Sequence, residues 1–155
     1  MDRNALVAHL IRPGQADGVS CRRLSANKLI ATSTWEQLKS YEQEFLRAYA
    51  LGAAAQTALL VGRSAACMHG IWTLPMRNAP VTMSYPKQAA PGRGSWREGV
   101  EFRRMNVPAT DSYTFTSRAG DTIRTTTPSR TAVDVARLHG VRHGVVAMDS
   151  LFYQA

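Results

Sequence analysis

The sequence predicts an α+β fold, in which a small all-helical head (residues 1–33) precedes a mixed body (residues 34–155) with a small sheet and flanking helices. Apolar residues recur at helical spacing near both ends of the chain, whereas β-branched and aromatic residues gather between positions 81 and 127. Pro, Gly and Asn separate these segments. The 155 residues, 45% of them hydrophobic and 19% charged, suit one folded domain or a small module.

The head is expected to begin with a helix that Asp2 caps and that ends before Pro13. Its apolar stripe is Leu6, Val7, Leu10 and Ile11. Gly18 and Val19 then turn the chain toward a helix over 21–27, where Val19 and Leu24 have the spacing of a hydrophobic staple. The stretch QADGVSCRRLSANKLI (15–30) is therefore interpreted as a helix-turn-helix.

The body is expected to mix helices with strands. A helical turn is predicted at 35–38, longer helices at 40–55, 65–69, 128–138 and 141–152, and strands at 59–61, 81–85, 100–105, 113–117 and 121–127. Gly70 and Gly140 are predicted helix stops. The connection 86–98, which is rich in Pro, Gly and Arg, is predicted to be a mobile basic loop.

Charge favours a polyanionic partner. The net charge is +8, and the basic residues are 16 Arg and 3 Lys; Arg binds phosphate and guanine bidentately. On a helix over 21–27, Arg22 and Arg23 would project outward, and Ser25, Asn27 and Lys28 would flank them and reach phosphates. These five residues are the candidate DNA contacts, and the alternative is an ordinary solvated basic face.

Catalysis finds little support in the sequence. No nucleophile–base pair, carboxylate cluster or phosphate-cradling glycine motif is visible, so neither a metal nor another cofactor is expected, and the protein is expected to be non-enzymatic. His139 and His143 have a metal-binding spacing, but Gly140 between them favours a loop. Asp134 has Arg130 at i−4 and Arg137 at i+3, which predicts ion pairs on a helix surface.

The compartment is expected to be the cytosol. Cys21 and Cys67 form no CxxC motif or Cys/His cluster, and no secretory signal precedes the first predicted helix. The most apolar span (48–61) is shorter than the roughly 20 residues that a membrane helix needs. A soluble protein without a membrane partner is therefore predicted.

Three segments together resemble the actinobacterial AbiEi-like antitoxin and transcriptional-regulator family. They are QADGVSCRRLSANKLI (15–30), GRSAACMHGIWTLP (62–75) and TTPSRTAVDVARLHGVRHGVVAMDSLF (126–152). The family pairs a reduced winged helix-turn-helix with an α/β segment that carries S-A-A-x-x-x-G and T-P-x-R-T-x-x-D-x-A helices. Order and spacing carry the resemblance, which covers nearly the whole chain.

The resemblance implies a recognition helix at 20–27, repression of the chain's own promoter region and neutralisation of a nucleotidyltransferase-type toxin. Relatives commonly follow the KLI segment with a basic β-wing. Here Ile30 runs directly into ATSTW, so we expect the wing to be deleted. Many relatives also continue into a restriction-endonuclease-like domain beyond the segment that matches MDSL.

The leading hypothesis is thus a DNA-binding regulator or antitoxin. One alternative is the truncated N-terminal part of a restriction-endonuclease-like protein. Another is a protein-binding module that docks a toxin or a second copy of itself, with Trp96 and Met76 as the expected anchors. Trp72 is expected to pack in the core.

Overall fold

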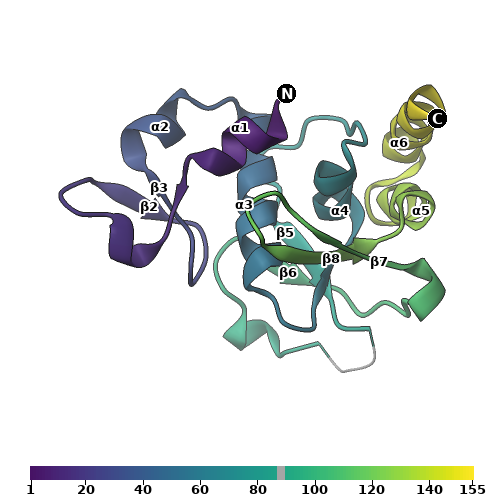
Figure 1. Ribbon diagram of the computed structural model, residues 1–155. Helices are drawn as coiled ribbons and strands as arrows, with labels where there is room; N and C mark the ends of the chain where they lie inside the picture. Colours follow the sequence, from purple (N-terminus) through teal and green to yellow (C-terminus); the bar gives the residue numbers. More distant parts are fainter. Residues whose placement is uncertain (87–89) are drawn as a thin grey trace.

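The computed structural model describes residues 1–86 and 90–155 and shows the α+β class (Figure 1). The N-terminal elements are α1 (Arg3–Ala8), β1 (Leu10–Ile11), β2 (Cys21–Arg23), β3 (Leu29–Ala31) and α2 (Thr32–Gln37). The remaining elements are α3 (Ser40–Ala54), β4 (Leu59–Leu60), α4 (Gly62–His69), β5 (Val81–Ser84), β6 (Val100–Phe102), β7 (Ser112–Thr116), β8 (Thr122–Thr126), α5 (Pro128–His139) and α6 (Val141–Gln154). Three 3₁₀ turns, at Pro13–Gln15, Arg93–Ser95 and Ala109–Asp111, lie in the connections.

A mixed five-stranded sheet forms the centre of the molecule, in the order β6-β5-β4-β8-β7. β4 pairs antiparallel with β5 and parallel with β8, while β5–β6 is parallel and β7–β8 is antiparallel. Leu60 joins the main core beneath α3, and its neighbour Leu59 packs with Met105 and Val107. This alternation follows from the opposite directions of successive side chains in a strand, so both faces of β4 are covered.

The predicted helix over 21–27 is wrong. Cys21–Arg23 and Leu29–Ala31 are strands of a hairpin, and β1 completes a three-stranded antiparallel sheet in the order β1-β3-β2. The amides of Leu24 and Ser25 both donate to the Lys28 carbonyl oxygen, at 3.0 and 3.2 Å, and close the hairpin turn. The hairpin buries Leu24, Leu29 and Ile30.

The KLI segment forms the second strand of a β-hairpin that carries two arginines on its first strand, and α2 begins directly after it, at the place where relatives were expected to carry a wing. The predicted hydrophobic staple between Val19 and Leu24 is absent, because Val19 is 52% exposed while Leu24 is buried.

Asp2 does cap α1, and its Oδ1 accepts from the amides of Asn4 and Ala5. The helix ends at Ala8, since Leu10 and Ile11 pair with β3 instead.

The body agrees with the sequence prediction in element type. All four predicted strands between 81 and 127 are present, and Gly70 and Gly140 end α4 and α5 with positive φ angles of 72° and 93°. α4 begins at Gly62 rather than after Ser64, whose hydroxyl instead accepts from the Thr82 amide at 2.9 Å. Within the predicted mobile loop, residues 87–89 lie outside the described part of the chain.

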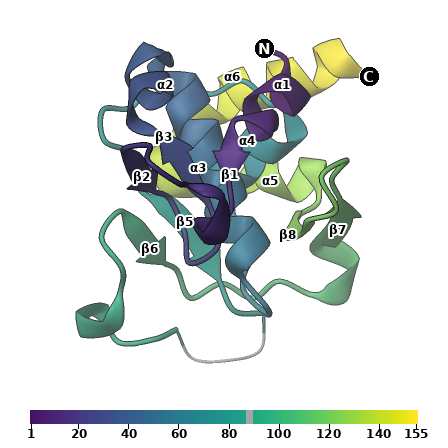
Figure 2. The same ribbon diagram turned by 60° about the vertical axis from the view of Figure 1, so that its left-hand side comes forward.

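Head and body share one hydrophobic core. Leu6, Leu24 and Ile30 from the N-terminal elements belong to the same buried cluster as Phe45 of α3 and Ile123 of β8. Figures 1 and 2 both place the small sheet beside α3, which agrees with this shared cluster. The first 33 residues are therefore packed onto the body.

The helices α5 and α6 form an outer pair beside α4 (Figures 1 and 2). They approach closely at Gly144, because a Cβ atom there would lie 2.9 Å from the Ala136 Cα. No helix in the described residues is both long and apolar enough to span a bilayer.

The predicted surface role of Asp134 is wrong, because this side chain is fully buried. Arg130 Nε donates to Asp134 Oδ1 at 2.9 Å, and Arg130 also donates to Asp111 Oδ2 at 2.8 Å and to the Asn106 carbonyl at 3.1 Å. Arg137, the other predicted partner, is 3.9 Å from the same Asp134 oxygen and mostly exposed. Arg130 therefore links α5 to the connection between β6 and β7 through its bonds to Asp111 and Asn106.

Candidate nucleic-acid interface

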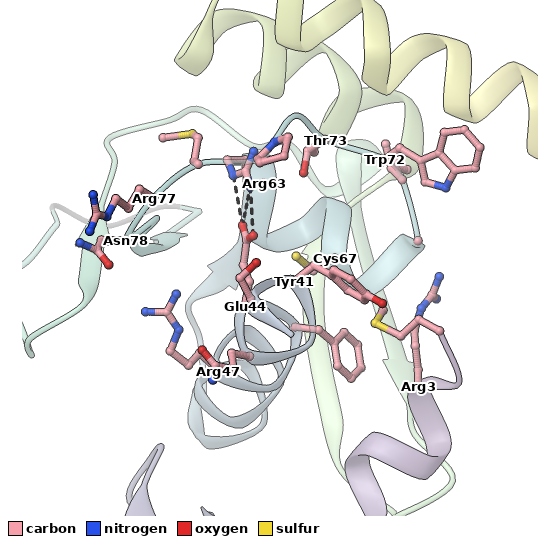
Figure 3. Close-up of a pocket in the computed structure, with 18 of the residues that line it drawn as sticks. Arg3, Tyr41, Glu44, Arg47, Arg63, Cys67, Trp72, Thr73, Arg77 and Asn78 are labelled. Atoms are coloured by element: carbon pink, nitrogen blue, oxygen red, sulfur yellow. Dashed lines mark hydrogen bonds and ion pairs between the residues drawn. The ribbon is translucent and has the colours of Figure 1, made fainter. Parts of the chain in front are cut away.

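Two hollows lie between the N-terminal elements and the body, with volumes of about 1000 and 270 Å³. Arg22 of β2 and Arg47 of α3 line both of them. The hollows therefore adjoin at these two side chains. The larger one is drawn in Figure 3.

Arginine dominates the charge in both hollows. We use the term arginine track for the six that have no carboxylate within salt-bridge distance in residues 1–86 and 90–155: Arg3, Arg22, Arg23, Arg47, Arg77 and Arg97. They come from α1, β2, α3 and the connections that follow α4 and precede β6. The acidic lining residues are Glu44 and Glu98.

A seventh arginine, Arg63, is neutralised in the larger hollow. It is buried in α4, and its Nε and Nη2 donate to the two carboxylate oxygens of Glu44 at 3.1 and 3.0 Å. Its Nη1 donates to the Leu74 carbonyl, which fixes the connection after α4. Figure 3 shows this pair between Arg47 and Arg77 at one end of the hollow and Arg3 at the other. The Glu44 charge is thus already compensated, and the remaining field is positive.

Local contacts hold three arginines of the track in place. The guanidinium of Arg22 lies 5.0 Å from the ring centroid of Trp35, a cation–π contact. Arg47 donates to the Ala79 carbonyl at 3.1 Å, and its buried Nε has no partner among the described residues. Arg3 donates to the Met68 carbonyl at 3.1 Å. These anchors reduce the rotamer entropy that a ligand would have to overcome.

Gly70 makes the position of Arg3 possible. A Cβ atom at residue 70 would lie within 2.8 Å of the Arg3 guanidinium carbon, and the φ angle of 72° also suits glycine. The same residue therefore ends α4 and leaves room for one end of the arginine track.

The larger hollow also has aromatic walls. Trp35, Tyr41 and Trp72 line it, and the Trp72 ring is 5.9 Å from that of Tyr153. Trp72 is 62% exposed, so the expectation that it packs in the core is wrong. Exposed aromatic faces beside arginines can stack on nucleic-acid bases or contact a protein.

The structure separates the five candidate DNA contacts into two groups. Arg22, Arg23 and Asn27 are exposed on the hairpin, and Arg23 donates to the Ala26 carbonyl. Ser25 and Lys28 are buried, so they do not face a ligand. Ser25 donates to Asn27 Oδ1 at 3.0 Å, and Lys28 pairs with Asp121 at 2.9 Å.

Met76 and Trp96, the two residues expected to anchor a protein partner, differ in their exposure to solvent. Met76 is 37% exposed and lines the larger hollow. Trp96 is half-buried, lies 6.0 Å from the Phe102 ring and donates from Nε1 to the Pro91 carbonyl. Trp96 therefore packs and hydrogen-bonds within its own part of the chain, and Trp72 is the more exposed of the two tryptophans.

Burial shifts the pKa of two titratable side chains of α4, Cys67 and His69. Burial raises the pKa of the Cys67 thiol, which lines the larger hollow, to about 12, so it stays protonated at neutral pH. His69 contacts the Thr126 carbonyl and the Thr125 hydroxyl, and burial lowers its pKa. Within the described ranges, no three His, Cys, Asp or Glu side chains are grouped to hold a metal.

Comparisons with protein-family models, with curated proteins and with solved structures find no match to this chain.

Proposed function

We propose that this chain is a DNA-binding transcriptional regulator that contacts the phosphate backbone through the arginine track. The observation that carries the proposal is the junction of the two hollows at Arg22 and Arg47, which connects six arginines without carboxylate partners in the described chain. Guanidinium groups bind phosphate through two parallel hydrogen bonds, and several along one path match the repeating charge of a nucleic-acid strand.

The β2–β3 hairpin supports the choice of DNA. It is a two-stranded ribbon with exposed Arg22 and Arg23 on one strand and exposed Asn27 at its tip. Such a ribbon can enter or follow a DNA groove, where arginine and asparagine are the side chains that read guanine and adenine. The hairpin replaces the recognition helix as the reading element of the proposal.

The antitoxin role rests on the resemblance to the AbiEi-like family. It adds the chain's own promoter region as the DNA target and a nucleotidyltransferase-type toxin as a partner. A second candidate function, docking of that toxin, is favoured by Trp72 and Met76 at the larger hollow, because both are exposed and such side chains anchor protein interfaces.

The test measures binding of a fluorescent duplex from the upstream region of the chain's own gene at several salt concentrations. The variant Arg22→Gln/Arg77→Gln removes two exposed track arginines, and Arg104→Gln/Arg118→Gln removes two exposed arginines that line neither hollow. We expect the track variant to bind about 10- to 100-fold more weakly and to lower the salt slope by about 2.

The control variant has the same net charge as the track variant, so it separates a defined interface from general attraction. We expect its affinity to stay within about threefold of the parent, because long-range attraction is screened at physiological salt. Equal losses in the two variants would contradict the assignment of the track. No binding by the parent protein would contradict the proposed function.

A further inference from the structure

Helix α6 presents an apolar stripe to solvent. Val141 is 78% exposed, Val145 51%, Met148 38% and Phe152 82%. The intervals of four, three and four residues place all four on one side of the helix. Sustained 4-3 spacing is the pattern with which one helix packs along another.

This stripe is separate from the face that α6 uses in its own fold. Gly144, Ala147 and Ser150 are buried, and Ala147 packs in a cluster with Ala132 and Val135 of α5. Ser150 also accepts from the Trp72 amide at 2.9 Å. The fold therefore anchors α6 by one face and leaves the stripe without a partner among the described residues.

Two residues of opposite charge lie along one edge of the stripe. Arg142 and Asp149 each follow a stripe residue by one position, both are exposed, and neither has a salt-bridge partner in residues 1–86 and 90–155. They are seven residues apart, which is close to two helical turns, so they lie along the same edge of the stripe. The opposite edge carries the uncharged Gly144 and Leu151.

This arrangement is complementary to itself in one orientation. When two identical helices pack antiparallel about a two-fold axis, the same edge of each helix meets its counterpart, so a positive charge near one end meets the negative charge near the other. Arg142 of one copy then lies beside Asp149 of the second copy, and the pair occurs twice. In a parallel arrangement each charged edge would meet an uncharged one.

We propose that α6 is a self-association surface, on which the α6 helix of a second copy packs antiparallel. Val141 then faces Phe152 of the second copy, Val145 faces its Met148, and two Arg142–Asp149 ion pairs lie along one edge of the apolar seam. In Figure 1, α6 lies on the side of the molecule opposite the β2–β3 hairpin. The dimer therefore leaves both hairpins open.

The first experiment measures the molecular mass of the full chain by sedimentation velocity from about 1 to 100 μM, the range expected for a small helix-on-helix interface. We expect a monomer–dimer equilibrium in the parent. Val145→Asp, which places a charge in the seam, is expected to weaken dimerisation at least tenfold. Phe152→Ser, at the 82% exposed end of the stripe, provides a second seam variant that spares the fold.

The second experiment uses the charged edge. Arg142→Asp or Asp149→Arg alone turns both attractive pairs into repulsive ones, and each is expected to weaken dimerisation about tenfold. The double variant Arg142→Asp/Asp149→Arg restores both pairs and is expected to recover dimerisation. A mixture of the two single variants is expected to form heterodimers.

Three results would overturn the proposal. They are a parent that is monomeric across the range, a dimer that both seam variants leave unchanged, and a double charge reversal that fails to recover what the single reversals lose. These measurements contain no DNA, so they are independent of the arginine track.

Discussion

Lys28 Nζ lies 2.9 Å from Asp121 Oδ2 and thereby joins the N-terminal hairpin to the turn between β7 and β8, 93 residues further along the chain. The Tyr49 hydroxyl donates to the same carboxylate oxygen at 2.7 Å and lies 2.7 Å from the Ser117 hydroxyl. Burial raises the pKa of Tyr49, so it remains a donor at neutral pH. This cluster fixes the hairpin that presents Arg22 and Arg23 against the body.

Replacement of Lys28 by Met is expected to lower the free energy of unfolding by roughly 1.5–3 kcal/mol, as for other hydrogen bonds to charged groups. The apolar stem is kept, but the largely buried Asp121 carboxylate loses its cation. Urea denaturation measures the change. Lys39→Met, at an exposed lysine that forms no salt bridge within the described residues, is the matched control and is expected to stay within about 0.5 kcal/mol.

Replacement of Arg130 by Ala is expected to cost about 3–5 kcal/mol at neutral pH, because it leaves the buried Asp134 carboxylate without its main partner. Arg137→Ala is the matched control: Arg137 is 3.9 Å from the same oxygen but 65% exposed, so we expect a loss below about 1 kcal/mol. Addition of Asp134→Asn to Arg130→Ala is expected to recover part of the stability. An equal loss in the two single arginine variants would contradict this account.

Acidification is expected to reduce the deficit of the Arg130→Ala variant. Burial raises the pKa of Asp134, and Arg130 lowers it, so removal of Arg130 raises it further. A carboxyl whose folded-state pKa is raised binds a proton more readily when folded. The favourable contribution of Asp134 protonation to the free energy of unfolding is therefore complete below the unfolded-state pKa of about 3.9. It is lost as pH rises through the pKa of the folded state. Urea titrations of parent and variant at pH 7 and pH 4.5 measure this difference.

Two half-buried histidines, His69 and His139, change the pH dependence of stability in the opposite direction. Burial lowers the pKa of His69 and of His139, so the unfolded chain binds protons more readily at these positions. Their contribution is present above the unfolded value of about 6.5 and is lost as pH falls toward the folded values. We expect the urea midpoint to drop between pH 7 and pH 5, and the drop to shrink in His69→Gln/His139→Gln. An unchanged slope in this variant would assign the pH dependence to other groups.

Replacement of Gly144 by Ala is expected to destabilise the protein by about 1–3 kcal/mol, although alanine favours helix by about 1 kcal/mol. The added Cβ would lie 2.9 Å from the Ala136 Cα, which is backbone and cannot rotate away. Gly14→Ala, where an added Cβ has nothing within 4 Å, is the control and is expected to be nearly neutral. Thermal unfolding measures both changes, and equal midpoints would contradict a tight α5–α6 contact.

The body could be predicted from the sequence because its signals are local. Pro128 at a helix start, Gly70 and Gly140 at helix ends and the β-branched runs after residue 81 each determine their own segment. The head could not be predicted in this way. β3 forms because Leu29 and Ile30 pair with Ile11 and Leu10 across the small sheet, and a short window such as 21–27 carries no information about that partner.

The residues of the candidate site also differ in whether a local sequence pattern could indicate them. Net charge and the Arg22-Arg23 pair predicted an anionic partner at residues 21–27, which were expected to form a helix, whereas Arg3, Arg47, Arg77 and Arg97 share no spacing that would join them. Ser25 and Lys28 were assigned outward positions by counting 100° per residue along a helix. Both residues lie in the turn that joins β2 to β3, where the helical count does not apply, so that count placed two buried groups on the surface.

The parallel pairing of Leu60 with Thr125 has a consequence for the order in which the molecule assembles. During synthesis, β4 leaves the ribosome long before β8 and meets β5 first, so one edge of the future central strand stays open while some sixty residues are added. Contacts this distant in sequence form slowly, and an open apolar edge can pair with other nascent chains. The central sheet can therefore be completed only after β8 has been synthesised and pairs with β4.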